Sequence, residues 1–350
     1  MTTKPIADCD VHSELDSLRD LYPYLAGRWR RQLETLGVRG YQGCNYPRFW
    51  PNREDARPPS GRAMGSEAGF MCSHYLDPYD VRYAILIPLA RVGVQPNRDF
   101  DVALASAVND WVRHEWLDGD PRFRASLTLP VEDPVAAVAE IERHAGDRRF
   151  VQVLFPGRPR EPMGRPKYWP ILEACAAHGL AVATHAAAGG SQPTTGAGWP
   201  SYYLEDHVSP AQSMQANVTS MVVEGVFERW PSLKLVSVEN GFAWLPSLLW
   251  RLDAAWDVYR DEVPHLPRRP SEYVEGHLYL ATQPMEEPKD PRHFLRLFDR
   301  CPALRTQLLF ASDYPHWDGD SPYEGFPARL PANLERAILF DNTRALYGLP

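Results

Sequence analysis

The amino-acid sequence predicts one large α/β domain, a (β/α)8 barrel with loop insertions after its first and fifth strands. Three observations predict this fold. Eight short apolar or β-branched runs are distributed along the chain. Helical patterns separate them, and this alternation is typical of a parallel sheet closed into a barrel. Several runs end in Asp, Glu or His, and the functional residues of such barrels stand where strands end.

The first predicted strand, residues 6–11, opens the stretch IADCDVHSEL. Asp8, Asp10, His12 and Glu14 occupy alternate positions, and alternate residues of a strand share one face. That face is either a wet surface or a metal site, with Asp8 the more structural hydrogen-bond acceptor. The other predicted strands are residues 83–88, 123–129, 150–155, 181–185, 233–238, 278–281 and 308–312.

The predicted helices carry recognisable start and stop signals. Residues 99–115 place their alanines and valines on one stripe. Asp133 is the expected N-cap of the next helix, with Pro134 at its first position. Gly179 is the expected end of the helix before the fifth strand. Residues 210–230 repeat apolar residues at helical spacing.

The chain is expected to form one domain over residues 1–350, because its length suits one barrel with insertions. The insertion at 38–80 is rich in Pro, Gly and aromatic residues and is predicted to cap the active site. A second insertion covers 188–207. A doubly wound open sheet is the alternative fold, but it usually brings a Gly-rich phosphate loop after strand one.

Composition limits the classes of partner and compartment. The 350 residues carry a formal net charge of −8, which argues against a nucleic acid partner. No apolar run reaches the roughly 18 residues of a membrane span, and the N-terminus lacks an apolar signal core. The five cysteines are widely spaced without a C-x-x-C pair. We therefore expect a cytoplasmic protein without a disulfide framework.

Metal-competent side chains follow four of the predicted strands. They are Asp10, His12 and Glu14 after the first strand, His185 after the fifth, Glu239 after the sixth, and Asp313 with His316 after the eighth. Strand ends meet at one mouth of a barrel, and a mixture of imidazole and carboxylate suits zinc, iron or manganese. Structural interpretations remain open: Glu14 as a helix N-cap, Glu239 as an ion-pair partner of Arg251, and the others as surface, core or turn residues.

The motifs DCDVH, VATH, GVFERWPSLKLVSVENGFAWLP, RLD and FASDYPHWD, spread from residue 6 to about 320, resemble a known family. It is the amidohydrolase-related barrel family that includes aminocarboxymuconate-semialdehyde decarboxylase and resorcylate decarboxylase. The resemblance implies a TIM barrel with a metal at its mouth. The zinc decarboxylases of this family typically carry His-x-His or Glu-x-His on strand one and a catalytic His after strand six. This chain has Asp10, His12 and Glu239 at those positions.

The number of candidate ligands exceeds what one zinc ion requires. They are Asp10, His12, Glu14, His185, His207, Glu239 and Asp313. This ligand pattern is similar to the barrel-type non-heme di-iron monooxygenases of platensimycin and platencin biosynthesis. The resemblance implies two iron ions, an external reductant and oxygen-dependent hydroxylation of an apolar small molecule, with coenzyme A-linked substrates in that branch. Family members are often dimers, so a homodimer is expected.

The di-iron hypothesis assigns further roles. Glu239, His207 and His316 are the candidate catalytic residues. The loop PGRPREPMGRPK at 156–167 could bind phosphates of coenzyme A, although a solvated basic loop is an equal alternative. Aromatic residues would line a dry pocket, unless they only pack the loops. The candidate substrate-binding residues are Arg158, Arg160, Arg165, Lys167, Trp199, Tyr203 and Trp317.

Two rival functions remain at this point. The first is a decarboxylase or hydrolase with one zinc or manganese ion, in which Glu239 or His207 transfers the proton. The second is a non-enzymatic barrel that binds a ligand, which the intact ligands at the strand ends argue against. The number of bound metal ions would separate the first rival from the di-iron enzyme.

Overall fold

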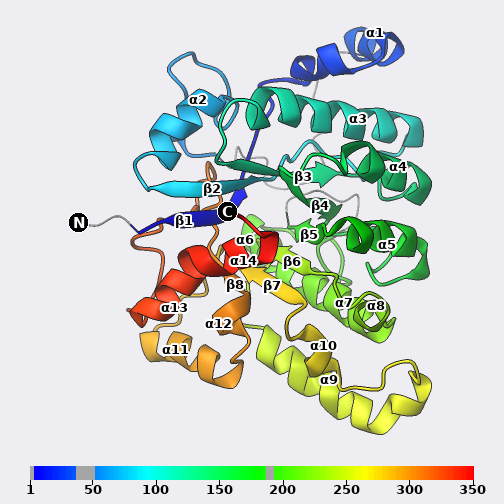
Figure 1. Ribbon diagram of the computed structural model, residues 1–350, viewed down its shortest axis with the longest axis vertical. Coiled ribbons are helices and arrows are strands. Elements are labelled where there is room, and N and C mark those ends of the chain that lie inside the picture. The colour runs from blue at the N-terminus through cyan, green and yellow to red at the C-terminus, as the bar shows by residue number, and fades with distance from the viewer. Residues whose placement is uncertain (1–3, 37–51, 187–192) are drawn as a thin grey trace.

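The computed structural model describes residues 4–36, 52–186 and 193–350, and it contains an eight-stranded sheet in which consecutive strands are neighbours. All seven strand pairs are parallel. Figure 1 shows the strands at the centre of the molecule and helices around them, the arrangement of a (β/α)8 barrel. The strands are β1 Ile6–Val11, β2 Val81–Leu86, β3 Phe123–Thr128, β4 Phe150–Pro156, β5 Ala181–His185, β6 Leu235–Val238, β7 Leu278–Ala281 and β8 Leu308–Leu309.

The segment that follows β8 brings the sheet back to β1. The N–H of Cys9 donates to the carbonyl of Phe310 at 2.9 Å, and the N–H of Asp313 donates to the carbonyl of Asp10 at 3.1 Å. The N–H of His12 donates to the carbonyl of Tyr314 at 2.8 Å. Although β8 itself is two residues long, its continuation therefore holds the eighth position beside the first strand.

The predicted strands match the observed ones, with small shifts at their ends. β2 begins two residues earlier than predicted because Val81 pairs with Ile6. β6 begins at Leu235 rather than at residue 233, since the N–H of Leu233 bonds in a turn to the carbonyl of Trp230. Both shifts depend on a neighbouring segment, which local composition does not describe.

The helices of the barrel wall lie between the strands. The α-helices are α1 Gly27–Leu36, α2 Ala68–Met71, α3 Arg98–Trp111, α4 Pro134–His144, α5 Trp169–His178, α6 Tyr203–Val208, α7 Pro210–Val223, α8 Val226–Arg229, α9 Leu245–Tyr259, α10 Pro270–Val274, α11 Pro291–Arg300, α12 Leu304–Gln307, α13 Ala332–Arg336 and α14 Asn342–Tyr347. Shorter 3-10 or π segments cover Leu18–Tyr24, Glu54–Ala56, Cys72–Leu76, Val112–Leu117, Pro166–Tyr168, Arg260–Glu262 and Ala337–Asp341.

Helix-end signals behave as their chemistry requires. The Asp133 side chain accepts from the N–H of Ala136 at 3.1 Å and caps α4, as predicted. Gly179 ends α5 in the left-handed conformation, with a φ of 67°. The single helix predicted over 210–230 is wrong in one respect. Gly225, with a φ of 73°, divides it into α7 and α8.

The interior of the barrel is closed at one end by the C-terminal residues. An apolar cluster of strand residues, including Ile85 and Val236, packs against Leu346, Tyr347 and Leu349. The Tyr347 hydroxyl donates to the amide oxygen of Gln152 at 2.5 Å. Figure 1 places α14 and the C-terminus over the middle of the ring of strands. The opposite end is therefore the mouth to which a substrate has access.

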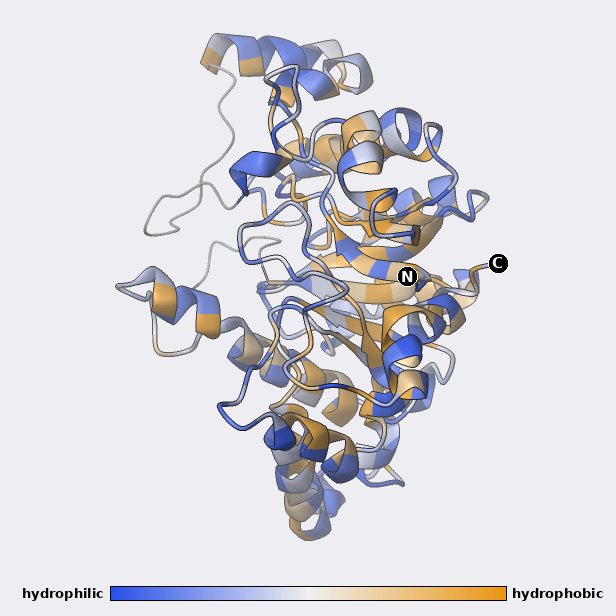
Figure 2. Ribbon diagram, turned by 90° about the vertical axis from the view of Figure 1, so that its left-hand side faces the viewer, coloured by the Kyte–Doolittle hydropathy of each residue, from blue (hydrophilic) through white to orange (hydrophobic). Residues whose placement is uncertain are grey.

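Hydrophobic residues gather on the strands and on the helix faces that cover them, while hydrophilic residues occupy the outer turns (Figure 2). Figure 2 also shows both chain termini on the same side of the molecule. Within the described residues, none of the helices combines the length and hydrophobicity needed to span a bilayer.

One close approach in the wall supports a prediction about stability. A Cβ atom added to Gly164 would overlap the backbone carbonyl of Ser220 on α7. We expect Gly164→Ala to lower the free energy of unfolding by about 1–3 kcal/mol, because backbone must move to make room. Chemical denaturation measures the loss. Gly146→Ala is the control, since no atom lies within 4 Å of its added Cβ. Equal stabilities of the two variants would contradict the prediction.

Candidate metal centre

Four buried side chains meet at the carboxyl ends of three strands. Asp10 lies in β1, His12 follows that strand directly, His185 is the last residue of β5, and Asp313 follows β8. One ligand atom of each lies within 4.8 Å of the others. All four residues are fully buried. The sequence analysis predicted each of them as a ligand, and the structure brings these four together.

The distances within this group are short. Nε2 of His12 lies 2.8 Å from Oδ1 of Asp313 and 3.4 Å from Oδ1 of Asp10. Nε2 of His185 lies 3.6 Å from the same oxygen of Asp10. The rings of His12 and His185 meet edge to face, with centroids 4.9 Å apart. Nitrogen and oxygen donors from opposite sides of the barrel therefore face one small volume.

The chemistry of this donor set fits a divalent cation. Within the described residues, neither carboxylate oxygen of Asp10 has a hydrogen-bond donor, and Oδ2 of Asp313 also lacks one. Leaving a carboxylate buried and unpaired is costly, so buried carboxylates normally find donors or a cation. Two imidazoles and two carboxylates form a ligand set that suits zinc, manganese or iron. Asp10, His12, His185 and Asp313 are therefore the residues that would hold the ion.

The orientation of His12 is set by a backbone carbonyl. Its Nδ1 lies 2.9 Å from the carbonyl oxygen of Ile87, which can only accept, so Nδ1 carries the hydrogen. With an ion bound, His12 would be neutral and would present the lone pair of Nε2 to that ion, as metal-binding histidines do. Burial alone would lower the pKa of His12, but the charges of Asp10 and Asp313 raise it to about 10.

A second group shares Asp313. Ligand atoms of Glu239, Asp313 and His316 also lie within 4.8 Å of one another. Nδ1 of His316 lies 2.6 Å from Oδ1 of Asp313, and its ring stacks on that of His12 at 4.3 Å. Oε2 of Glu239 lies 3.2 Å from Nδ1 of His185. The predicted catalytic residues Glu239 and His316 are therefore next to the candidate metal ligands.

Burial and neighbouring charges give the carboxyls of this second group opposite acidities. Burial, with the charges of Asp313 and Asp10, raises the pKa of Glu239 well above its ordinary value. Burial would also raise the pKa of Asp313, but the charge of His316 and hydrogen bonds from His12 and His316 hold it well below the usual range. Asp313 is therefore the more acidic of the two carboxyls and Glu239 the less acidic.

Two of these residues have unusual backbone conformations. Glu239 has a φ of 58° and Asp313 a φ of 56°, in the left-handed region that side chains other than glycine rarely occupy. Such residues cost about 1–3 kcal/mol each and persist where the surrounding structure holds them, often at functional sites. Glu239 directly follows β6, and Asp313 lies in the segment that continues β8 beside β1, so each left-handed residue turns the chain at the mouth.

Asp8 supports the cluster from below. Its Oδ1 accepts the N–H groups of Asp10 at 3.0 Å and Ser312 at 3.1 Å, and its Oδ2 accepts the hydroxyl of Tyr75 at 2.6 Å. It thereby ties β1 to the segment that carries Asp313, the structural role predicted from its position. Burial raises the pKa of Asp8 to about 7. The sequence analysis missed Tyr75, since nothing near residue 75 identifies its distant partner.

Two of the predicted ligands lie outside both groups. β1 ends at Val11, and the N–H of Glu14 turns aside to donate to the carbonyl of Gly65 at 2.9 Å. The strand alternation on which the Glu14 prediction depended therefore stops before residue 14. His207 lies on α6 with its Nε2 3.1 Å from Asp318 and its Nδ1 3.2 Å from the hydroxyl of Tyr203. Neither residue supplies an atom to the candidate metal groups.

The basic loop after β4 does not gather its charges into one phosphate site. Lys167 lies 2.6 Å and Arg160 3.7 Å from carboxylate oxygens of Glu132. Arg165 pairs with Glu224 on the outer surface at 3.0 Å. Of the four basic residues, Arg158 is the one that pairs with none of these glutamates. It lies beside Thr194 and Asp206, two neighbours that the sequence analysis did not identify.

The predicted aromatic lining and cap are only partly described. Trp199 and Trp317 are exposed on more than half of their surface, and Tyr203 is partly buried against His207. Residues 38–51 of the predicted cap lie outside the described residues. Its remaining part reaches the mouth, because Asn52 forms a bridge with His316 and the N–H of Arg53 donates to the carbonyl of Pro315.

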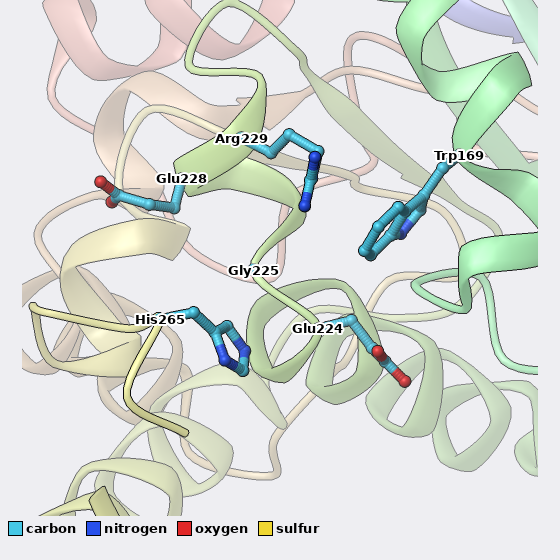
Figure 3. Close-up of a pocket in the computed structure, with 6 residues that line it drawn as sticks. All are labelled: Trp169, Glu224, Gly225, Glu228, Arg229 and His265. Carbon is cyan, nitrogen blue, oxygen red and sulfur yellow. The ribbon is translucent and has the colours of Figure 1, made fainter. Parts of the chain in front are cut away.

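A pocket of about 550 Å3 lies away from this cluster (Figure 3). Its lining residues are Trp169, Glu224, Gly225, Glu228, Arg229 and His265. Arg229 stacks over Trp169, and a ring nitrogen of His265 lies 2.7 Å from the carbonyl oxygen of Val223. Glu224 and Glu228 pair with arginines at 3.0 and 3.1 Å. Glu224, Glu228 and His265 therefore already have polar partners outside the pocket lining.

Comparison with known proteins gives the chain a family context. A model of the family described as "Amidohydrolase" matches residues 7–349. A gamma-resorcylate decarboxylase of Rhizobium sp. (strain MTP-10005) is 24% identical over 265 residues, which cover 73% of this chain and 79% of the relative. The gamma-resorcylate decarboxylase of Rhodococcus jostii (strain RHA1) is 24% identical over 312 residues, covering 78% and 90%.

Solved structures with the same fold include other decarboxylases. The 5-carboxyvanillate decarboxylase of Sphingomonas paucimobilis has a TM-score of 0.70 at 19% identity, covering 99% of this chain and 100% of that one. A dihydroxybenzoic acid decarboxylase from Polaromonas sp. JS666, with bound manganese and the inhibitor 2-nitroresorcinol, has a TM-score of 0.67 at 18% identity, covering 100% and 98%. These structural similarities establish the shared fold.

The expectation of a di-iron monooxygenase is wrong. The named relatives are decarboxylases, and none of those cited points to an iron oxygenase, a coenzyme A substrate or an external reductant. The structure also leaves Glu14 and His207, the residues invoked for a second iron, outside the ligand groups. The expectation that the protein is an oxidoreductase is therefore also wrong. The homodimer stays a prediction.

Proposed function

This chain belongs to the amidohydrolase family, and from that premise we propose its function. We propose that it is a metal-dependent enzyme that decarboxylates a hydroxylated aromatic acid with one divalent metal ion. The carrying observation is the buried group of Asp10, His12, His185 and Asp313 at the mouth, with its unpaired carboxylate oxygens. The decarboxylases among its relatives support the reaction type. The mononuclear alternative raised by the sequence is thus the one we adopt.

The residues at the mouth have different roles in the proposed reaction. A divalent cation held by these residues would supply positive charge that withdraws electrons from the substrate. His12 and His185 present their Nε2 atoms from opposite sides, and Asp10 and Asp313 complete the set. His316 contacts Asp313 through Nδ1 and holds that carboxylate in its orientation. Residues that are already in place need not reorganise during the reaction.

Glu239 is the proton donor in this proposal. Decarboxylation breaks the bond between the ring carbon and the carboxylate, CO2 leaves, and the electron pair stays on the ring carbon until a proton arrives. Glu239 stands at the mouth on a left-handed turn, with Oε2 beside His185. Its carboxyl lies beside the candidate metal ligands, where the substrate would bind, and in this proposal it delivers the proton to that carbon.

Metal analysis with a carbon dioxide assay tests the proposal. Protein produced with iron, manganese and zinc available should retain about one divalent ion per chain. It should release CO2 from 2,6-dihydroxybenzoate or a related hydroxybenzoate. A chelator should abolish this release and added manganese should restore it, as expected when the ion supplies catalytic charge. Cleavage of esters or amides without any CO2 release would instead assign the site to a hydrolase.

A further inference from the structure

Arg158 is notable among the charged residues near the mouth because its side chain is mostly buried and few acceptors surround its guanidinium. Its side chain is 12% exposed. Its only hydrogen bond within the described residues is from Nη1 to the hydroxyl of Thr194 at 2.8 Å. Nε is buried and has no acceptor. A guanidinium carries five N–H groups, so most of its donor capacity is unused.

Its place in the fold is beside the candidate metal ligands. The last residue of β4, Pro156, pairs with His185, the last residue of β5. Gly157 follows, and a Cβ there would lie 2.6 Å from the carbonyl oxygen of His185. Arg158 is therefore the first residue with a side chain beyond β4, two positions after the residue that pairs with His185.

The nearest carboxylate does not neutralise this arginine well. Asp206 lies 4.0 Å from Nη1 of Arg158 and already accepts the hydroxyl of Thr194 at 2.5 Å. Thr194 is itself anchored, because Ser213 donates to its carbonyl. Burial lowers the pKa of the Arg158 guanidinium; the charge of Asp206 acts in the opposite direction without reversing the shift, and the charge of Arg91 adds to it. An anion bound beside Arg158 would compensate the positive charge of its guanidinium, which lies in a mostly buried environment.

The other basic residues of the same loop behave differently. Arg160, Arg165 and Lys167 all lie within 4.0 Å of glutamate oxygens, on Glu132, Glu161 or Glu224. Arg160 and Arg165 are also about half exposed. Each of these three cations therefore already has a carboxylate partner. Among the basic residues of this loop, only Arg158 is both mostly buried and short of acceptors.

We infer that Arg158 binds a carboxylate that the substrate keeps, so that the preferred substrates are aromatic dicarboxylic acids that lose one carboxyl group and retain the other. This inference rests on the proposed decarboxylase function and specifies its substrate class. A guanidinium can hold a carboxylate through two parallel N–H bonds, which fixes the orientation of the ring as well as its affinity. Thr194 contacts only Nη1 of the guanidinium, and Asp206 lies 4.0 Å from the same atom, so the other N–H groups are left for the carboxylate.

Two unreactive probes test binding without turnover. Isophthalate and benzoate differ by one carboxylate, and calorimetry on the manganese-loaded protein gives their dissociation constants. We expect isophthalate to bind at least 10-fold more tightly than benzoate. Arg158→Gln should remove this preference while benzoate affinity stays the same, since one charge-assisted pair accounts for a factor of about 10–100. Arg160→Gln, from the same loop, should keep the preference.

A structural role for Arg158 gives a different result. If the arginine only stabilises the loop, Arg158→Gln will lower the melting temperature and leave the ratio of the two affinities unchanged, which overturns the inference. Thr194→Val keeps the guanidinium and removes its anchor, so it should weaken isophthalate binding selectively by less than Arg158→Gln does. Equal affinity of the wild-type protein for both probes also overturns the inference.

The test of the carboxylate site at Arg158 can fail or succeed independently of the test of the proposed decarboxylase function. If isophthalate preference depends on Arg158 but no aromatic acid releases CO2, the anion site stands and the decarboxylase proposal fails. If hydroxybenzoates are decarboxylated while the second carboxylate brings no gain in KM, the decarboxylase stands and this inference fails. With both correct, Arg158→Gln should raise KM for a dicarboxylic substrate about 10–100-fold, with a smaller change in kcat.

Discussion

Replacing His12 with alanine is expected to abolish decarboxylation and to weaken metal binding by at least about 100-fold. His12 lies between two buried carboxylates, with Nε2 3.4 Å from Asp10 and 2.8 Å from Asp313. Changing residues that merely orient a ligand already costs about 10–100-fold in metal affinity, so loss of a ligand itself should cost at least as much. Alanine also leaves the two carboxylates facing each other without a nitrogen between them.

Metal content after dialysis, measured together with CO2 release, gives the result. His178→Ala is the matched control, because His178 lies at the end of α5 and contacts Glu142 at 2.8 Å, outside both ligand groups. It should keep its metal and its activity. Full metal occupancy in His12→Ala, with circular dichroism like that of the wild type, would remove His12 from the metal site.

Replacing Glu239 with glutamine is expected to lower kcat by about 100- to 10,000-fold, the range that proton transfer by a positioned group contributes. Glutamine nearly preserves the shape of the side chain and its contact with His185, so metal content should stay the same. The amide cannot deliver the proton that the ring carbon requires. Loss of kcat with retained metal separates a proton donor from a metal ligand.

Single-turnover CO2 release, with metal analysis of the same sample, measures this effect. His207→Gln is the comparison, since His207 contacts Asp318 and Tyr203 at 3.1 and 3.2 Å and lies outside both ligand groups. It should reduce kcat less than about 10-fold. A larger loss in His207→Gln than in Glu239→Gln would transfer the proton-donor role to the histidine. Loss of metal in Glu239→Gln would make the glutamate a ligand.

Much of the fold could be predicted because the strands of the barrel are short apolar runs that can be recognised from neighbouring residues alone. β3, β5 and β7 have buried apolar runs whose limits follow from the residues alone. β8 could not be predicted as a two-residue strand, because its continuation bonds to β1 through residues about 300 positions away in the chain. The division between α7 and α8 was missed although Gly225 marks it, since the apolar spacing continues across the glycine.

The candidate site was predictable where the strand pattern continued and unpredictable where it stopped. Asp10 and His12 share a face by alternation, and the structure keeps both in the cluster. Glu14 would share that face only if the strand ran on, but β1 ends at Val11. Glu14 and His207 were counted as ligands from their residue types and their positions in the sequence, and that count led to the di-iron hypothesis, which the named relatives contradict.

By itself, the sequence determined which residues close the strands with metal-competent side chains, because strand periodicity and composition act over a few neighbouring positions. Only the tertiary structure decided which of those side chains share one volume. Glu239 and Asp313 reach it through left-handed turns, with φ values of 58° and 56°, which no local pattern announces. Arg158 is separated from the other basic residues of its loop by burial and by Thr194, 36 positions along the chain. The charge and the ligand chemistry of a side chain follow from its residue type. Whether several side chains meet at one site, and whether a charged group is removed from water, depend on contacts between distant segments of the chain.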